Sequence, residues 1–432
     1  MHTLQQLKSG QLKGVKELRL SEGLTEFPSE IVDLADTLEL LDLSGNKLSG
    51  LPADFAKLKK LKIAFFSDNL FTEFPKEIAA CPELEMIGFK SNQITTVAEG
   101  VFPEKLRWLI LTNNQIQSIP KSIGKCYRLQ KVAFAGNCLT ELPVEMANCK
   151  NLELLRISAN QLKQFPEWLL SLPKLTWLAV SGNAYNSKHT IHNSLAKVSW
   201  DDLEIHNVLG SGASGIISKA KWLSKQQEIA VKVFKGEVTS DGLPHDEMLA
   251  CIEAGYHTNL VKVIGQLMNH PEGKEGLVLE LIPNDYSNLG LPPSFISCTR
   301  DTFKDDAEFS LQTILTTIKG VSSAAKHLHE RYIMHGDLYA HNILIDTNAN
   351  PLLGDFGAAT IYDEKNKQTM LFEKLDVRAF GCLLDDMLQR VVRDEIADAK
   401  HVILSKLRDD CMQEEITLRP SFEEIEKRLL EL

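Results

Sequence analysis

Residues 106–116 read LRWLILTNNQI, and the same arrangement of apolar residues and one asparagine recurs along the first half of the chain. Residues 38–48 (LELLDLSGNKL) and 152–162 (LELLRISANQL) are two of the other copies. The asparagine falls at positions 46, 69, 92, 114, 137, 160 and 183, with 23 residues between copies except for one step of 22. A repeat at this fixed period predicts a solenoid, in which each copy forms one turn and stacks on the next.

The spacing within one copy predicts its local structure. The leucines of the central L-x-L lie two residues apart, so they point to the same side of a short strand. The asparagine amide both donates and accepts hydrogen bonds, so it can satisfy backbone groups where the strand turns away. The frame L-x-x-L-x-L-x-x-N-x-L is typical of leucine-rich repeats, and residues 1–183 are predicted to form an α/β leucine-rich-repeat solenoid of about eight repeats.

The third position of each copy is predicted to face the concave side of the solenoid, next to solvent. Exposed apolar patches mark interaction sites, and tryptophan is a frequent hot-spot residue at protein interfaces. We therefore expect this column to bind a protein substrate or regulator, although the same side chains can instead cover one another. The column consists of Leu40, Ile63, Met86, Trp108, Lys131, Leu154 and Trp177.

The charge distribution divides the chain near residue 200. Residues 1–200 contain 23 Lys+Arg and 20 Asp+Glu, a net charge of +3, whereas residues 201–432 contain 24 and 38, a net charge of −14. The total charge of −11 argues against a nucleic-acid partner, which requires a basic face. The repeat period stops after Asn183, so residues 184–201 are predicted to be a cap and linker and residues 202–432 a second domain.

The sequence shows none of the usual signals for a membrane or an oxidising compartment. No stretch approaches the roughly 20 apolar residues that a membrane-spanning helix requires. The N-terminal residues lack the apolar core of a signal peptide, and the eight cysteines form no C-x-x-C pair. We therefore expect no membrane span and a cytoplasmic location.

The second half carries a glycine-rich motif followed by a strand-like segment that ends in a lysine. Residues 209–217 read LGSGASGII, and Lys232 follows the third glycine by 17 residues. Dinucleotide-binding folds share the G-x-G-x-x-G spacing but need an acidic residue about 20 positions on and no such lysine. The pattern therefore favours ATP, whose α- and β-phosphates Lys232 would hold while it pairs with Glu247 or Glu253, of which Glu247 is favoured. The residues predicted to contact the nucleotide here are Leu209, Gly210, Ser211, Gly212, Ala213, Ser214, Gly215, Ile217, Ala230, Lys232 and Glu247.

Two further motifs supply oxygen atoms suited to phosphoryl transfer. Residues 335–344 read HGDLYAHNIL, and residues 355–357 read DFG. Asp337 is predicted to be the catalytic carboxylate beside the attacking hydroxyl, with Lys232 and Asn342 completing the catalytic set. Asn342 and Asp355 are predicted to bind Mg²⁺, because this ion prefers hard oxygen ligands.

In order and spacing, these motifs resemble those of a eukaryotic-type protein kinase domain of the tyrosine-kinase-like group, over residues 203–432. Residues 376–381 (DVRAFG) and 418–422 (LRPSF) are similar to two further kinase segments. Residues 15–183 resemble leucine-rich repeats of the 23-residue intracellular type, so the chain as a whole resembles a leucine-rich-repeat protein kinase without a membrane span. The resemblance implies a bilobal α+β protein-kinase-like domain with a hinge that holds adenine, in which Glu280, Ile282 and Leu344 contact the nucleotide.

The resemblance also implies an activity. We expect an ATP- and Mg²⁺-dependent protein kinase that transfers the γ-phosphoryl group to a protein hydroxyl, with serine/threonine favoured by the group. Two positions depart from the family pattern: Gly336 replaces the arginine before the catalytic aspartate, and Tyr339 replaces a lysine two residues after it. A catalytically weak kinase-fold scaffold or adaptor and a small-molecule phosphotransferase therefore remain open as alternatives.

The segment between Asp355 and Asp376 is short and contains no A-P-E triplet. Only Glu373 could replace the acidic residue of that triplet and pair with Arg419. This segment also contains three candidate modification sites, Thr360, Tyr362 and Thr369.

Overall fold

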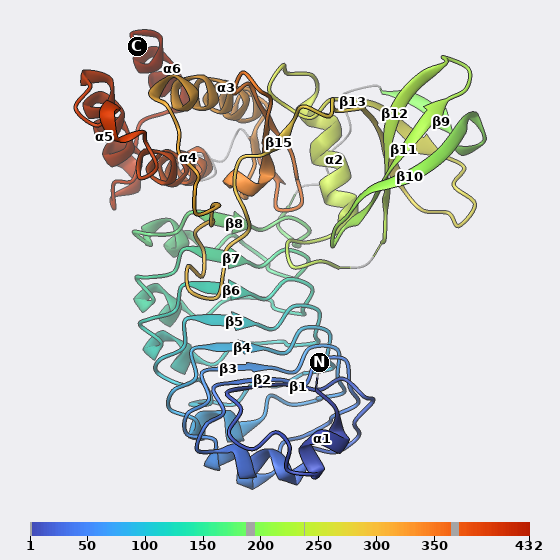
Figure 1. Ribbon diagram of the computed structural model, residues 1–432, viewed down its shortest axis with the longest axis vertical. Helices are drawn as coiled ribbons and strands as arrows, with labels where there is room; N and C mark the ends of the chain where they lie inside the picture. The colour runs from blue at the N-terminus through green and yellow to red at the C-terminus, as the bar shows by residue number, and fades with distance from the viewer. Residues whose placement is uncertain (1, 187–194, 237, 364–370) are drawn as a thin grey trace. The chain divides into compact units, whose positions relative to one another are not determined.

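The computed structural model describes residues 2–186, 195–236, 238–363 and 371–432 (Figure 1). The chain divides into two compact units. The first comprises Met1–Leu175 and Asn183–Tyr185, and the second comprises Thr176–Gly182 and Asn186–Leu432. The described residues contain both predicted fold types, parallel strands in the first half of the chain and a mixed α+β arrangement in the second.

The repeats form a sheet of eight short parallel strands that follow one another in chain order (Figure 1). Each strand has three residues, and from β1 to β7 each pairs with the next one without offset, so Trp108 lies between Met86 and Lys131. The L-x-L spacing predicts this arrangement, and the leucine-rich-repeat fold is confirmed. The strands are β1 (Glu17–Arg19), β2 (Leu40–Asp42), β3 (Ile63–Phe65), β4 (Met86–Gly88), β5 (Trp108–Ile110), β6 (Lys131–Ala133), β7 (Leu154–Arg156) and β8 (Trp177–Ala179).

Short 3-10 helices form the return path of most repeats, and a proline stands immediately before each of them. Each proline is the N-cap residue and has extended backbone, which its fixed φ of about −65° accommodates. The regularly spaced prolines of the sequence therefore begin the return paths. The helices are η1 (Ser29–Leu34), η2 (Ala53–Lys57), η3 (Lys76–Ala80), η4 (Lys121–Lys125), η5 (Val144–Asn148) and η6 (Glu167–Ser171); α1 (Leu4–Lys8) precedes them.

The repeat asparagines are buried and tie each turn to the one before it. The Asn114 amide oxygen accepts a hydrogen bond from the Ile94 N–H at 3.0 Å. Its amide nitrogen donates to the carbonyl oxygens of Phe89 at 2.9 Å and Leu111 at 3.0 Å. Equivalent bonds recur at Asn69 and at other asparagines of the ladder. The asparagine is therefore required because it satisfies backbone groups of two turns at once.

Replacing Asn114 with alanine should destabilise the repeats. The change leaves the Ile94 N–H without its partner, whereas the Phe89 and Leu111 carbonyl oxygens keep one bond each, from Asn92 and Asn137. A buried unpaired group costs about 1–3 kcal/mol. We expect the free energy of unfolding to fall by about 1–3 kcal/mol, measured by urea denaturation of the whole chain with far-ultraviolet circular dichroism. The neighbouring exposed Gln115→Ala is the control. An equal effect of both changes would contradict the proposed role of the ladder.

The predicted concave column is only partly open to solvent. Leu40 and Met86 are buried, whereas Ile63 and Trp108 are half-buried. The Lys131 ammonium lies 4.4 Å from the centroid of the Trp108 ring, which places a cation over an aromatic face. Neighbouring side chains therefore cover part of the column, and Ile63, Trp108 and Lys131 form a partly exposed apolar and cationic surface on β3, β5 and β6.

The second unit contains a six-stranded sheet beside one helix, α2 (Pro244–Ala254) (Figure 1). Residues 187–194 of the predicted linker lie outside the described residues, and Ala196–Ser199 forms an edge strand of this sheet. In spatial order the strands are β10 (Leu203–Ser211), β11 (Gly215–Trp222), β12 (Gln227–Phe234), β14 (Gly276–Glu280), β13 (Val263–Met268) and β9 (Ala196–Ser199).

A predominantly helical part follows. It contains α3 (Leu311–His329), α4 (Phe372–Leu388), α5 (Ala399–Cys411) and α6 (Phe422–Leu430). Short strands carry the loops that connect them: β15 (Ser287–Asn288), β17 (Ile343–Ile345) and β18 (Pro351–Leu353) form one sheet, and β16 (Ile333–Met334) pairs with β19 (Thr360–Ile361). The sheet part and the helical part together give the predicted two-lobed α+β domain. The remaining 3-10 helices are η7 (Trp200–Asp202), η8 (Ala340–Asn342), η10 (Arg393–Glu395) and η11 (Ile416–Leu418).

Alternation along β12 separates two cores on the faces of the six-stranded sheet. Ile229 and Val231 pack into one core, and Ala230 and Phe234 pack into the other with residues of α2. Side chains of a strand alternate between the two faces, so Lys232 lies on the same face as Ala230 and Phe234. The strand therefore directs the lysine toward α2.

Two histidines meet where the turn after α2 contacts α3. The rings of His257 and His327 are 4.8 Å apart, His257 Nε2 lies 3.3 Å from Ser323 Oγ, and His327 Nε2 lies 2.8 Å from the Ala254 carbonyl oxygen. Burial lowers the pKa of both histidines, and a positive charge on His327 would further oppose protonation of His257. The surrounding charged groups are Arg331, Glu330 and Glu426.

The second unit should lose stability on acidification because of this pair. A histidine whose pKa is lower in the folded state binds fewer protons there than in the unfolded chain. The stability that such a histidine contributes is fully present above its unfolded-state pKa of about 6.5. This stability is lost as the pH falls through the lower pKa of the folded state. His327→Gln should therefore weaken the pH dependence of the denaturation midpoint between about pH 5 and 7, relative to the exposed control His206→Gln. An unchanged pH dependence would refute this role of the pair.

Candidate active site

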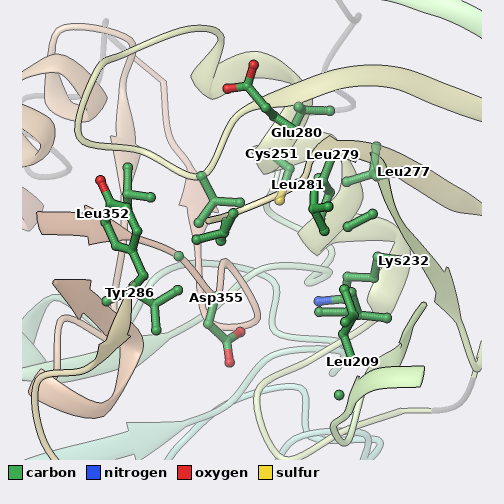
Figure 2. Close-up of a pocket in the computed structure, with 18 of the residues that line it drawn as sticks. Leu209, Lys232, Cys251, Leu277, Leu279, Glu280, Leu281, Tyr286, Leu352 and Asp355 are labelled. Atoms are coloured by element: carbon green, nitrogen blue, oxygen red, sulfur yellow. The ribbon is translucent and has the colours of Figure 1, made fainter. Parts of the chain in front are cut away.

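A cavity of ≈770 Å³ lies in the second unit, between the six-stranded sheet and the loops of the helical part (Figure 2). Its lining comes from β10, β11, β12 and α2 on one side and from η8, β17 and the residues after β18 on the other. Most of the residues predicted from separate motifs meet in this cavity. They are Leu209, Gly210, Ile217, Ala230, Lys232, Glu247, Glu280, Ile282, Asn342, Leu344 and Asp355.

The glycine-rich segment is the hairpin between β10 and β11. Ser211, Gly212, Ala213, Ser214 and Gly215 are not part of the cavity wall, because they form or flank the tip of this hairpin. A Cβ atom on Gly215 would lie 2.7 Å from the Val233 carbonyl oxygen, so only glycine fits where β11 pairs with β12. Cβ atoms on Gly210 and Gly212 would meet nothing within 4 Å. These two glycines therefore leave room for a ligand to approach the backbone.

Lys232 forms an ion pair with Glu247 at the inner end of the cavity. The sequence left Glu247 and Glu253 as alternatives, and the pair is with Glu247, which is buried on α2. Burial alone would lower the pKa of Lys232, but the carboxylates of Glu247 and Asp355 outweigh burial and hold the pKa above its usual value. The lysine is therefore a fixed cation that faces the cavity.

The loop of residues 335–342 is held to α4 by one buried carboxylate. Asp376 accepts hydrogen bonds from the backbone N–H groups of His335 at 2.7 Å and Gly336 at 3.0 Å. Its Oδ2 atom also lies 2.9 Å from His329 Nε2. Burial would raise the pKa of Asp376, but the bond to His329 and the neighbouring charges keep the pKa below its usual value. The carboxylate is thus charged, and it fixes the start of the loop.

The backbone explains the glycine at position 336, where the family pattern has arginine. Gly336 has a φ of +71°, a conformation that side chains with a Cβ rarely adopt. A Cβ atom there would lie 2.8 Å from the Ala358 carbonyl oxygen. Glycine therefore allows the loop to approach the segment after residue 357 closely.

Asp337 and Asn342 contact each other directly. The Asn342 amide nitrogen donates to the Asp337 carbonyl oxygen at 2.9 Å and to Asp337 Oδ2 at 3.0 Å. Asn342 lines the cavity, so its contact with Asp337 connects Asp337 to the cavity wall. Because the amide nitrogen makes both bonds, the amide oxygen is available to a ligand.

Asp355 faces the cavity from the residues after β18 (Figure 2). Its φ of +55° is a strained conformation for a residue other than glycine, and such strain is common at functional sites. The next residue, Phe356, is buried, with its ring centroid 5.3 Å from that of His335. His335 Nε2 in turn lies 3.0 Å from the Gly354 carbonyl oxygen. Packing on both sides therefore holds Asp355 in place.

Sequence reasoning missed several residues of the cavity wall. Leu277 shares the alternation of β14 with Leu279, and that period could have identified it. Cys251 lies one helical turn after Glu247, and burial raises the pKa of its thiol. His341 directly precedes Asn342 in the motif of residues 335–344, and that position could have identified it. Tyr286 and Leu352 lie in segments without a periodic pattern, so no sequence signal pointed to them.

The candidate modification sites differ in accessibility. Thr360 and Tyr362 are buried, and the Tyr362 hydroxyl lies 3.0 Å from His329 Nδ1. Thr369 lies outside the described residues.

Glu373 is the residue predicted to pair with Arg419. Glu373 accepts the backbone N–H of Phe422 at 2.8 Å, and Arg419 donates to the Gln413 and Lys374 carbonyl oxygens.

Among the described residues, no helix has both the length and the apolar composition that crossing a membrane would require.

Comparison with known proteins assigns both parts of the chain. Residues 203–379 match the protein kinase domain family, and residues 37–58 and 104–162 match leucine-rich-repeat families. The cysteine-rich receptor-like protein kinase 37 of Arabidopsis thaliana is 30% identical over 215 residues, which cover 44% of this chain and 31% of that protein. The PR5-like receptor kinase of the same plant is 27% identical over 188 residues, covering 43% and 26%.

A rice protein, the G-type lectin S-receptor-like serine/threonine-protein kinase LECRK2 of Oryza sativa subsp. japonica, is 30% identical over 244 residues, covering 48% of this chain and 27% of that protein. The chain therefore spans less than a third of the length of these three relatives. In its own sequence, the chain carries leucine-rich repeats followed by a protein kinase domain.

Proposed function

We propose that the chain is an ATP- and Mg²⁺-dependent serine/threonine-protein kinase of the tyrosine-kinase-like group. The observation that carries the proposal is that Lys232, Asn342 and Asp355 line one cavity, with Asp337 in contact with Asn342. Lys232 lies more than 100 positions before the two motifs that supply Asp337, Asn342 and Asp355. Their convergence supports phosphoryl transfer rather than an unrelated use of each motif.

The nucleotide would lie between the sheet and β17. Ala230, Leu344 and Ile217 offer apolar surface to adenine, and the backbone at Glu280 and Ile282 offers hydrogen-bonding groups along its edge. The open space above Gly210 and Gly212 lets backbone N–H groups approach the phosphates. Lys232 supplies a cation for the α- and β-phosphates, and Glu247 fixes its position.

The oxygen atoms of Asn342 and Asp355 fit Mg²⁺. One carboxylate and one amide oxygen are hard ligands, and Mg²⁺ in nucleotide sites usually has few protein ligands besides waters and phosphates. When bound, the metal would neutralise the charge that develops on the phosphoryl oxygens. Asn342 would then connect the metal to Asp337, whose carboxylate would orient the attacking hydroxyl and accept its proton.

The alternatives fit the site less well. A scaffold that only binds nucleotide does not need the Lys232–Glu247 pair and the inward-facing Asp355 together. A small-molecule phosphotransferase does not need the repeats, because leucine-rich repeats generally bind proteins. We infer that the partly exposed surface of Ile63, Trp108 and Lys131 takes part in recruiting a protein substrate or regulator. A cytoplasmic location accords with this role.

Loss of Lys232 or Asp337 should abolish most phosphoryl transfer. We expect Lys232→Met and Asp337→Asn each to reduce kcat by about 100-fold or more, because a fixed cation and a general base each contribute at least that factor. The measurement is Mg²⁺-dependent transfer of labelled γ-phosphate from ATP to casein, followed by phosphoamino-acid analysis, which should yield phosphoserine or phosphothreonine. Equal activity of the wild type and both variants would overturn the proposal, and label on a small acceptor alone would favour the phosphotransferase.

The two glutamates of α2 provide a matched pair. Glu247→Gln removes the charge that fixes Lys232, and we expect kcat/KM for ATP to fall by about 10- to 100-fold. Glu253→Gln changes the same residue type on the same helix, away from Lys232, and should remain within about twofold of the wild type. A larger effect at Glu253 than at Glu247 would show that the ion pair is not part of the nucleotide site.

The repeats should promote the phosphorylation of proteins that they bind, but not of casein. Trp108→Ala should leave the labelling of casein unchanged but reduce the number or intensity of labelled proteins when the kinase is added to a cell extract from its own source. The buried Phe89 is unsuitable for this test because its loss would disturb the solenoid core, so Gln115→Ala is the control. Identical labelling by the wild type and Trp108→Ala would exclude a recruiting role for this surface.

A further inference from the structure

A segment between the hinge and α3 runs beside the loop that carries Asp337 and Asn342. Strand β15 pairs with β17, and the backbone N–H groups of Leu289 and Gly290 donate to the carbonyl oxygens of Ile343 at 2.9 Å and Ala340 at 3.2 Å. The Asn288 amide nitrogen donates to the His341 carbonyl oxygen at 2.6 Å. The segment is therefore bound to the loop over residues 340–345.

The same segment returns to this loop with a buried carboxylate. Asp301 Oδ2 accepts the backbone N–H of His341 at 2.9 Å, and Asp301 Oδ1 lies 2.7 Å from His341 Nδ1. The Asp301 side chain is only 1% exposed. A buried carboxylate is costly unless it is hydrogen-bonded, so both of its oxygens contribute to holding His341 in one orientation.

The neighbouring residue anchors the segment to α4. Arg300 Nη2 donates to Asp386 Oδ1 at 2.7 Å, to Asp385 Oδ2 at 2.9 Å and to the Cys382 carbonyl oxygen at 2.9 Å. Helix α4 also carries Asp376, which holds His335 and Gly336. The loop is thus attached to one helix at its start, through Asp376, and near its end, through Arg300 and Asp301.

Asp337 and Asn342 lie directly beside these two attachment points. Asp337 follows Gly336, and Asn342 follows His341 and donates to Asp337 Oδ2. A change in the orientation of His341 would therefore alter the distance between the proposed base and the proposed metal ligand. Misplacement of a reacting group by about 1 Å can reduce a rate about 100-fold.

We propose that Asp301 is a positioning residue for phosphoryl transfer, which acts by fixing His341 and thereby aligning Asn342 with Asp337. The proposal rests on the proposed kinase function. Asp301 lies 36 positions before Asp337 in the sequence and is not part of the cavity wall. It acts through His341, which contacts its carboxylate and directly precedes the proposed metal ligand Asn342.

The first test is Asp301→Asn in the whole chain. An amide has the same size but no charge and only one acceptor oxygen. If that oxygen keeps the bond to the His341 backbone N–H, the amide N–H faces Nδ1 and the contact between the carboxylate and the imidazole is lost. We expect kcat to fall about 10- to 100-fold, because loss of a residue that orients a metal ligand typically has an effect of this size. The Mg²⁺ concentration for half-maximal turnover should rise. The exposed Asp305 belongs to the same segment, and Asp305→Asn should match the wild type.

Two readouts separate positioning from general destabilisation. The dissociation constant of ATP without metal, measured by calorimetry, should stay within about twofold of the wild type. Combining Asp301→Asn with His341→Ala should reduce kcat no further than His341→Ala alone, because both changes remove one interaction. Multiplicative losses, or a parallel loss of ATP affinity and thermal stability, would overturn the positioning role.

A conservative variant tests the same contact even if Asp301→Asn does not fold. The side-chain nitrogen of asparagine can donate from nearly the same place as His341 Nδ1, so His341→Asn should keep kcat within about threefold of the wild type while His341→Ala does not. Equal losses in both His341 variants would overturn the proposal. An inactive Asp337→Asn with a fully active Asp301→Asn would refute this inference alone, whereas an active Asp337→Asn would refute the kinase function itself.

Discussion

The candidate site depends on the buried carboxylate of Asp376. This group accepts two backbone N–H groups from the catalytic loop and contacts His329 of α3, so three segments meet at one charge. Moving the loop away would remove two of the hydrogen bonds to this buried charge, each worth about 1.5–3 kcal/mol. The loop is therefore a fixed part of the helical core, although it has almost no regular secondary structure. Asp337 has a defined position because the residue before it is bonded to α4.

A buried carboxylate also fixes the charged group on the opposite wall of the cavity. Alternation along β12 directs Lys232 toward α2, and the buried Glu247 keeps its ammonium group there. On one wall, the buried Glu247 of α2 positions Lys232. On the other wall, the buried Asp376 of α4 positions the loop that carries Asp337. Both networks hold groups of the cavity in fixed positions, as electrostatic stabilisation of a phosphoryl group requires.

Much of this could be predicted from the sequence because the information is local. Each repeat contains its own leucines and asparagine, so one copy specifies one turn, and the motifs around Lys232, Asp337 and Asp355 are short. Asp301 and the pair His257–His327 could not be predicted, because each contact joins residues 40 or more positions apart without any periodic pattern. The orientation of the concave column followed from the period of two, but the burial of Met86 depends on side chains of neighbouring turns, which the period does not specify.

The most direct test of the account is a crystal structure of the whole chain with Mg²⁺ and a non-hydrolysable ATP analogue. The account predicts the triphosphate beside Lys232, beneath the hairpin of residues 211–215, with the metal bound by Asn342 and Asp355 and with Asp337 facing the γ-phosphate. A nucleotide bound elsewhere, or a metal that contacts neither Asn342 nor Asp355, would contradict it.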